Sequence, residues 1–230
     1  MLDTNGALKI FWFRKDLRIL DNRALSCFID DINPRDKYLF IYIKNKDNLK
    51  YCGEMRLAFL KQSLEELSAS LKEKNLSLSI LIGNSFDLFK AILDKHKHLS
   101  VYANKQFEPY SVERDNQISE LLSKSGSELK LFSDTTLFEP NEIVKDDGTP
   151  YSVFTPFSKK CYSLLNENHY ADSRTLINKL NPDNCLSIKS DKLKQYIPSP
   201  VFKGGRKEGL EFLKHFYNTA LSKYKSQRDF

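Results

Sequence analysis

The sequence predicts an α/β fold: a five-stranded, doubly wound parallel sheet, followed by a long linker and a lone amphipathic helix. Two observations support the sheet. Apolar segments of strand length alternate with helical segments as far as residue 132, which is the order typical of parallel sheets. The apolar segment at residues 38–43 is uninterrupted, as expected for a strand that is buried on both faces. The strands are expected at residues 10–13, 38–43, 76–82, 99–103 and 129–132.

Segments with helical periodicity separate the expected strands. The clearest covers residues 54–74, where leucines recur at spacings of three and four with charged residues between them. Other helices are expected at residues 21–32 and 109–124, with Pro109 in the first turn of the second. Ser85 is expected to cap a further helix, because its hydroxyl can accept a hydrogen bond from an early backbone N–H.

The pattern changes after the fifth strand. A strong turn signal at residues 146–150 precedes a short helix, and residues 166–203 then show no period. A loop of this length is unusual inside a compact domain, so we interpret it as an inter-domain linker. The predicted organisation is therefore an α/β domain at 8–165, a linker at 166–203, and the start of a truncated second domain at 204–230. This last segment carries an apolar stripe that nothing visible in the sequence covers: Leu210, Leu213, Phe216, Ala220, Leu221 and Tyr224.

Composition limits the classes of function. The net charge of +6 and the pI near 9.0 favour an anionic partner, such as nucleic acid or a phosphate-bearing ligand. If only the net charge is considered, lysines scattered over a soluble surface are a simpler explanation than an anionic partner. The cysteine spacing predicts no metal site, and no apolar segment approaches the ~20 residues of a membrane span, so a cytoplasmic protein is expected. No Walker A, GxGxxG or Ser/His/Asp pattern occurs, and no catalytic residue is predicted.

Four separated segments resemble the DNA photolyase and cryptochrome family. Residues 10–25, IFWFRKDLRILDNRAL, are similar to the family's opening strand and its FR-DLR and DN-AL pattern. Residues 102–115, YANKQFEPYSVERD, are similar to the segment after the fourth strand, and residues 147–157, DGTPYSVFTPF, to the hairpin and Y-x-V-F-T-P-F motif. Residues 204–230 look like the opening of the family's helical flavin domain. The matches follow the family's order and span essentially the whole chain.

The resemblance implies a Rossmann-like N-terminal antenna domain, a long connection and a C-terminal all-helical domain. In this family the helical domain holds FAD and binds damaged DNA. Excited FAD donates an electron to a pyrimidine dimer, which splits and returns the electron. The antenna domain can hold a second pigment, a folate, a deazaflavin or FMN, which passes excitation energy to FAD. The cofactors carry this chemistry and the protein positions them.

The carboxyl ends of the expected strands define a candidate antenna site, because ligands of open α/β sheets bind there. Arg14 is expected to clamp a phosphate or carboxylate group. Asn104 and Glu108 are expected to contact the edge of a heterocycle. Lys44 ends the second strand, and Arg56, at the start of the long helix, is expected to face the same crevice.

The residues at the carboxyl ends of the strands have an alternative interpretation, and so does the identity of the pigment. Arg14, Asp16 and Arg18 can instead form a structural ion-pair network, which is at least as good an interpretation for Asp16 and Arg18. Folate-binding members of the family have a histidine and an Asn-Glu pair where this sequence has Lys50 and Tyr110-Ser111. This departure favours a deazaflavin, FMN or an empty pocket over methenyl-tetrahydrofolate.

The resemblance covers little of the helical domain. Tyr224 matches a family position that contacts the FAD phosphate, and Arg228 matches one near the DNA backbone. Because the rest of the flavin pocket is absent, the 230 residues alone are expected neither to hold FAD tightly nor to repair DNA.

We interpret the chain as the light-harvesting domain of a photolyase that repairs cyclobutane pyrimidine dimers and acts as a monomer. In the full-length protein, damaged DNA would bind through the missing helical domain. Three alternatives remain: a cryptochrome-type blue-light photoreceptor, a generic nucleotide-binding module, and a scaffold domain without a ligand.

Overall fold

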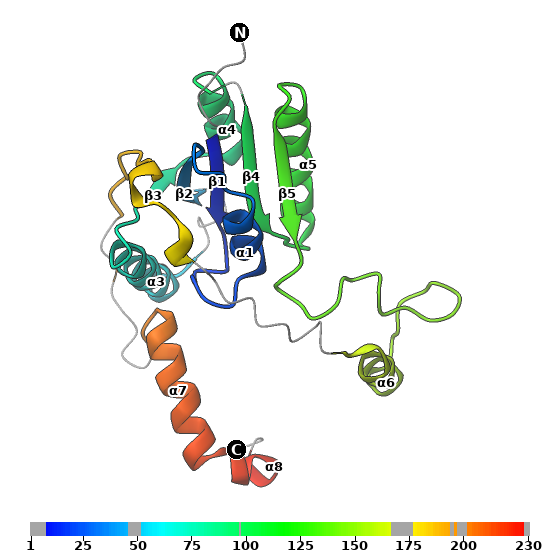
Figure 1. Ribbon diagram of the computed structural model, residues 1–230. Helices are drawn as coiled ribbons and strands as arrows, with labels where there is room; N and C mark the ends of the chain where they lie inside the picture. The colour runs from blue at the N-terminus through cyan, green and yellow to red at the C-terminus, as the bar shows by residue number, and fades with distance from the viewer. Residues whose placement is uncertain are drawn as a thin grey trace.

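A computed structural model describes residues 8–45, 52–96, 98–166, 177–193, 196 and 202–227. Its five parallel strands form one sheet in the order β3-β2-β1-β4-β5, which confirms the predicted fold class (Figure 1). The strands are β1 (Leu8–Phe13), β2 (Lys37–Lys44), β3 (Leu78–Ile82), β4 (Leu99–Asn104) and β5 (Glu128–Phe132). The chain builds outward from β1 through β2 to β3, then crosses to the other side of β1 for β4. The carboxyl ends of β1 and β4 therefore flank the topological switch point, where ligands of such sheets bind.

Helices cover both faces of the sheet, and β1 contributes to both layers. Phe11 and Phe13 pack with residues of α1 and α3, whereas Ile10 and Trp12 pack with residues of α4 and α5. All six residues of β1 are buried, which explains the apolar run at residues 10–13, and the buried Lys9 is ion-paired with Asp36. The helices are α1 (Arg23–Asp30), α3 (Glu54–Lys72), α4 (Ser85–Leu93), α5 (Pro109–Ser123), α6 (Phe154–Leu164), α7 (Arg206–Thr219) and α8 (Tyr224–Gln227).

Asparagine side chains cap two of the helices. Asn22 precedes α1 and accepts a hydrogen bond from the backbone N–H of Leu25 at 3.2 Å. The predicted cap at Ser85 is wrong, because Asn84 takes that position and accepts from the N–H of Phe86 at 2.8 Å. Ser85 is instead the first residue of α4. Both residue types make good caps, and the extended backbone at Asn84 decides between them.

Residues 177–193, which the sequence places in the linker, lie along the open edge of β3. The N–H of Asp191 donates to the carbonyl of Ile80 at 2.8 Å, and its carboxylate accepts from the N–H of Ile82 at 2.7 Å. Ile177 and Leu180 are buried in the core on the α1 and α3 side of the sheet. This segment therefore satisfies an edge strand that would otherwise present unpaired backbone groups.

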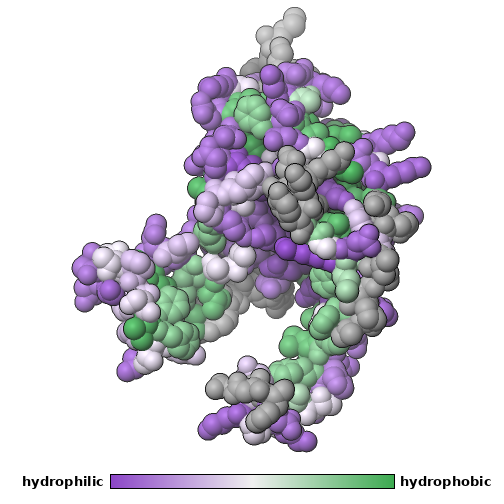
Figure 2. Space-filling model, turned by 180° about the vertical axis from the view of Figure 1, so that it is seen from behind, coloured by the Kyte–Doolittle hydropathy of each residue, from purple (hydrophilic) through white to green (hydrophobic). Residues whose placement is uncertain are grey.

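Helices α6 and α7 project beyond the carboxyl ends of the strands (Figure 1). Neither helix buries a residue, and hydrophobic side chains gather over both of them (Figure 2). The predicted uncovered stripe of the last segment is confirmed, since Leu210, Leu213 and Phe216 of α7 are all exposed. Among the described helices, none is both long and apolar enough to cross a membrane.

Candidate ligand site

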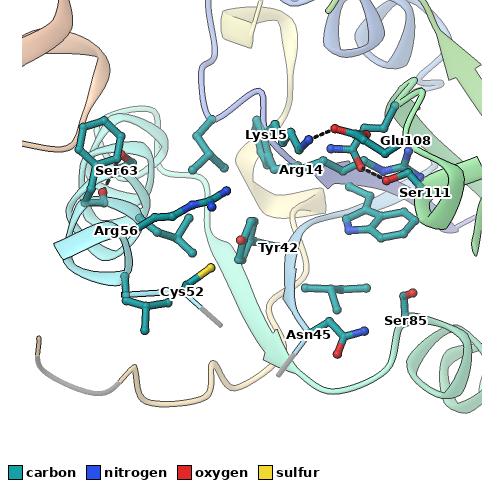
Figure 3. A pocket seen from close by; sticks show the side chains of 18 of the residues that line it. Arg14, Lys15, Tyr42, Asn45, Cys52, Arg56, Ser63, Ser85, Glu108 and Ser111 are labelled. Atoms are coloured by element: carbon teal, nitrogen blue, oxygen red, sulfur yellow. Dashed lines mark hydrogen bonds and ion pairs between the residues drawn. The ribbon is translucent and has the colours of Figure 1, made fainter. Parts of the chain in front are cut away.

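A cavity of about 740 Å³ opens at the carboxyl ends of β1 and β2 (Figure 3). The loop and first turns of α5 form a second side, α3 forms a third, and the start of α7 closes part of the rim. Aromatic and aliphatic side chains supply much of the wall. This size and character are those of a small-molecule site. The apolar lining residues are Trp12, Phe13, Leu17, Tyr42, Ile43, Leu57, Phe59 and Leu60.

The lining is strongly cationic. Six of the described lining side chains carry a positive charge and one carries a negative charge. The one acid, Glu108, is ion-paired with Lys15 at the exposed rim, and this pair holds the pKa of Glu108 below its usual range. Four of the six are paired with carboxylates, three of them with carboxylates outside the lining, and an excess of positive charge in the lining favours an anionic ligand. The cationic residues are Arg14, Lys15, Arg18, Arg56, Arg114 and Arg206.

Arg14 is the most buried of these cations, with 7% of its surface exposed. Its two terminal nitrogens donate to the two carboxylate oxygens of Asp115, each at 2.8 Å, and one also donates to the carbonyl of Asn104 at 3.1 Å. Burial, with Arg114 nearby, lowers the pKa of Arg14 to about 10, so it stays charged at neutral pH. Its Nε is buried without a partner among the described residues.

Arg56 and Arg206 line the opposite side of the cavity. Neither makes a hydrogen bond or ion pair with a described residue, and Arg56 points into the cavity (Figure 3). Arg206 is placed by the junction of α7 with α3: the N–H of Gly204 donates to Gln62 at 2.8 Å, and that of Lys207 to Glu66 at 3.0 Å. These two arginines are therefore available to bind a phosphate or carboxylate.

Asn104 belongs to a buried hydrogen-bond network rather than to the cavity. Its amide nitrogen donates to Asp16 at 2.6 Å and to Asn22 at 2.9 Å, and its oxygen accepts from the N–H of Ala24 at 3.2 Å. Arg18 joins the same region through its ion pair with Asp134 at 2.6 Å. Asp16 therefore fits the alternative prediction of a structural polar network. Arg18 is both ion-paired and part of the cavity lining.

The remaining predicted residues lie apart from the cavity. Lys44 donates to the hydroxyl of Tyr196 at 2.9 Å and is not among the lining residues. Tyr224 is exposed on α8, and Arg228 and Lys50 lie outside the described residues. Of the five predicted antenna residues, the structure brings Arg14, Arg56 and Glu108 to the cavity; all the binding roles stay predictions.

Among the lining residues that the sequence prediction did not include, Trp12, Arg114 and Arg206 bear most on the chemistry of the cavity. Trp12 was interpreted only as part of a strand, although its side chain reaches the cavity. Arg114 lies one helical turn after Tyr110 in α5, so the spacing of four was the available signal. Arg206 had no signal, because its place depends on how α7 meets α3.

The fold is a doubly wound α/β domain with a cavity, lined by six cationic side chains, at the carboxyl ends of its strands. The sequence profile described as DNA photolyase matches residues 9–174, and the chain belongs to that family. The predicted resemblance is therefore confirmed.

Both branches of the family occur among the similar proteins. The deoxyribodipyrimidine photo-lyase of Agrobacterium fabrum is 27% identical over 96% of this chain and 47% of its own length. Cryptochrome-2 of Arabidopsis thaliana is 32% identical over 69% of this chain and 26% of its own length. A class III photolyase crystal structure from Agrobacterium tumefaciens aligns with a TM-score of 0.78 at 25% identity, covering 99% of this chain and 48% of that one. The chain thus spans between a quarter and a half of the length of these relatives.

Proposed function

We propose that this chain is the light-harvesting domain of a DNA photolyase that acts on cyclobutane pyrimidine dimers, and that its cavity holds an anionic, planar pigment. The observation that carries the proposal is the cavity of about 740 Å³ in which aromatic walls meet six cationic side chains. When bound, the pigment would supply light absorption and pass the excitation on. The protein would bind it, orient it and exclude water.

The lining fits a flavin-type pigment with a phosphate group. Tyr42 and the aliphatic side chains of the wall offer apolar surface to a ring system, while Arg56 and Arg206 offer donors to a phosphate. FMN or a deazaflavin is favoured over methenyl-tetrahydrofolate, because the folate-type residues are absent from the sequence around Lys50 and Tyr110.

Binding of FAD and of damaged DNA would belong to a helical domain that begins near residue 204, with Tyr224 toward the FAD phosphate and Arg228 toward the DNA backbone. On this proposal the 230 residues alone neither hold FAD tightly nor repair DNA. A cryptochrome-type photoreceptor is the second candidate, supported by the 32% identity to the plant cryptochrome. Light-dependent dimer repair by this domain together with its own helical domain, rather than one borrowed from a known photolyase, separates the two.

The first test is a titration of the purified chain with FMN, a deazaflavin, methenyl-tetrahydrofolate and riboflavin. We expect saturable binding of FMN that exceeds binding of riboflavin, because riboflavin lacks the phosphate. Arg56→Ala and Arg206→Ala should each weaken FMN binding about tenfold, or ~1.4 kcal/mol. Arg35→Ala, an exposed arginine away from the cavity, is the matched control. Absence of binding by every pigment would favour the scaffold alternative.

A further inference from the structure

Trp12 is the single tryptophan of the chain, and it lies in the cavity wall. Only 3% of its surface is exposed, and the edge of Phe89 supports it with ring centroids 5.1 Å apart. Two guanidinium groups lie over its ring, that of Arg14 at 4.0 Å and that of Arg114 at 4.8 Å from the centroid. One indole with two such cations is more than packing requires.

The charges that lie over the indole are positive, and their carboxylate partners bind the guanidinium groups or the backbone beside them. Arg14 and Arg114 both bind Asp115, so that two cations share one carboxylate. The next carboxylate, Asp16, accepts hydrogen bonds from the amides of Asn22 and Asn104 and from the backbone N–H of Arg14. The charges in direct contact with the face of the Trp12 ring are thus the guanidinium groups of Arg14 and Arg114, in a poorly solvated wall where electrostatic interactions are strong.

An indole in contact with a photoexcited flavin-type ligand is a ready electron donor. In that step the indole loses one electron and becomes a radical cation, the ligand gains the electron, and the excitation is lost. A cation held over the ring disfavours the positive charge that would form on the indole. The same arginines attract the ligand and oppose the side reaction.

We propose that Arg14 and Arg114 suppress electron transfer from Trp12 to the excited ligand in this cavity, so that the excitation survives long enough to be passed on. This inference rests on the proposed function of the cavity as a pigment site. It assigns to the two arginines a role separate from anion binding, namely setting how easily Trp12 is oxidised.

Tyr42 is the other buried aromatic side chain with a redox-active ring in the wall, and it needs less protection. Burial raises the pKa of Tyr42 to about 12. Among the described residues its hydroxyl has no hydrogen-bonded carboxylate or histidine to take the proton that phenol oxidation releases, and the titratable group beside it is the thiol of Cys52. Trp12 has no such requirement, because an indole radical cation forms without proton loss.

The first experiment uses the ligand-free chain. Trp12 is oxidised with azidyl radicals, which are small and uncharged, and its loss is followed by mass spectrometry. Arg114→Gln, which removes the charge, should raise the oxidation rate at least about threefold, whereas Arg114→Lys, which keeps it, should stay near the wild-type rate. Acrylamide quenching of the single tryptophan checks that its exposure is unchanged. Equal rates in all three proteins at equal exposure would overturn the inference.

The second experiment measures the fluorescence lifetime of FMN bound at saturation. We expect the lifetime in Arg114→Gln to be at least about threefold shorter than in the wild type, and the Trp12→Phe/Arg114→Gln double variant to recover it. Unchanged lifetimes, or a short lifetime that persists without Trp12, would contradict the inference while leaving the pigment site intact. Failure of FMN and deazaflavin to bind the wild-type chain would instead remove the proposed function on which it rests.

Discussion

The sheet domain and the two projecting helices use the same apolar residue types in opposite ways. Every residue of β1 is buried, whereas α6 and α7 bury none. Phe28 of α1 is fully buried, while Phe212 of α7 is 48% exposed. The sheet domain thus completes its own two hydrophobic cores, and α6 and α7 carry apolar faces that only a further surface can cover. The difference separates apolar residues that hold this fold together from apolar residues that remain at its surface.

The largest difference in the free energy of unfolding is expected between truncating a core side chain and truncating a side chain on a projecting helix. Phe28 lies among Phe11, Phe40 and Tyr102, at centroid distances of 5.6, 5.6 and 5.3 Å. Phe28→Ala should lower the free energy of unfolding by about 3–5 kcal/mol in urea denaturation. Leu213→Ala on α7, 60% exposed, should change it by less than about 0.5 kcal/mol. A large loss in the Leu213 variant would show that α7 is part of the stable unit.

The second contrast sets a buried ion pair against an exposed one. Asp115→Asn leaves Arg14 and Arg114 without their shared carboxylate, and should lower the free energy of unfolding by about 3 kcal/mol. The control is Glu120→Gln, which removes the exposed pair with Lys124 and should have no measurable effect. Similar small effects in both variants would mean that Asp115 is replaceable as a partner.

The junction between the two regions depends on Gly204. A Cβ atom there would lie 2.0 Å from the carbonyl oxygen of Phe59, so Gly204→Ala must displace the start of α7 from α3. We expect faster amide exchange at Lys207, by about tenfold or ~1.4 kcal/mol of local stability, with little change in the core. Gly209→Ala within α7 has open space and should instead stabilise the helix by up to about 1 kcal/mol.

The smallest expected effect is a pH dependence that belongs to the sheet domain. Burial alone would raise the pKa of Asp36, but the N–H of Asn33 at 2.9 Å and the ion pair with Lys9 at 3.0 Å together hold it below its usual range. Because the pKa is lower in the folded chain, Asp36 stabilises the fold above the ordinary aspartate pKa of about 3.9, and this contribution disappears as the pH falls through the folded value.

Asp36→Asn should therefore cost about 1 kcal/mol near pH 7, and the difference from the wild type should vanish near pH 2. Urea denaturation at both pH values measures it. A difference that is the same at pH 7 and pH 2 would show that shape, not charge, is what Asp36 contributes.

The strands were predictable because a strand that is buried on both faces consists mostly of consecutive apolar residues. Turn residues mark where these apolar segments begin and end. The site was predictable only in part. Arg14 follows β1 directly and Glu108 lies in the short loop after β4, so their place at the carboxyl edge is set by local sequence. Asn104 ends β4, yet its short amide meets Asp16 and Asn22 before it can reach the cavity. Arg206 enters the wall through a contact between distant segments, which no local pattern records.

Because residues 177–193 are anchored to the sheet, the segment that follows them limits how far α7 can move from the sheet domain. Asp191 is fixed to β3 and Gly204 to α3. The chain between them spans at most about 45 Å, at roughly 3.5 Å per residue. Because this segment is short, any polypeptide joined to α7 would be held near the cavity rim at an effective concentration on the order of millimolar. It could then bind the sheet domain even if its intrinsic affinity were weak.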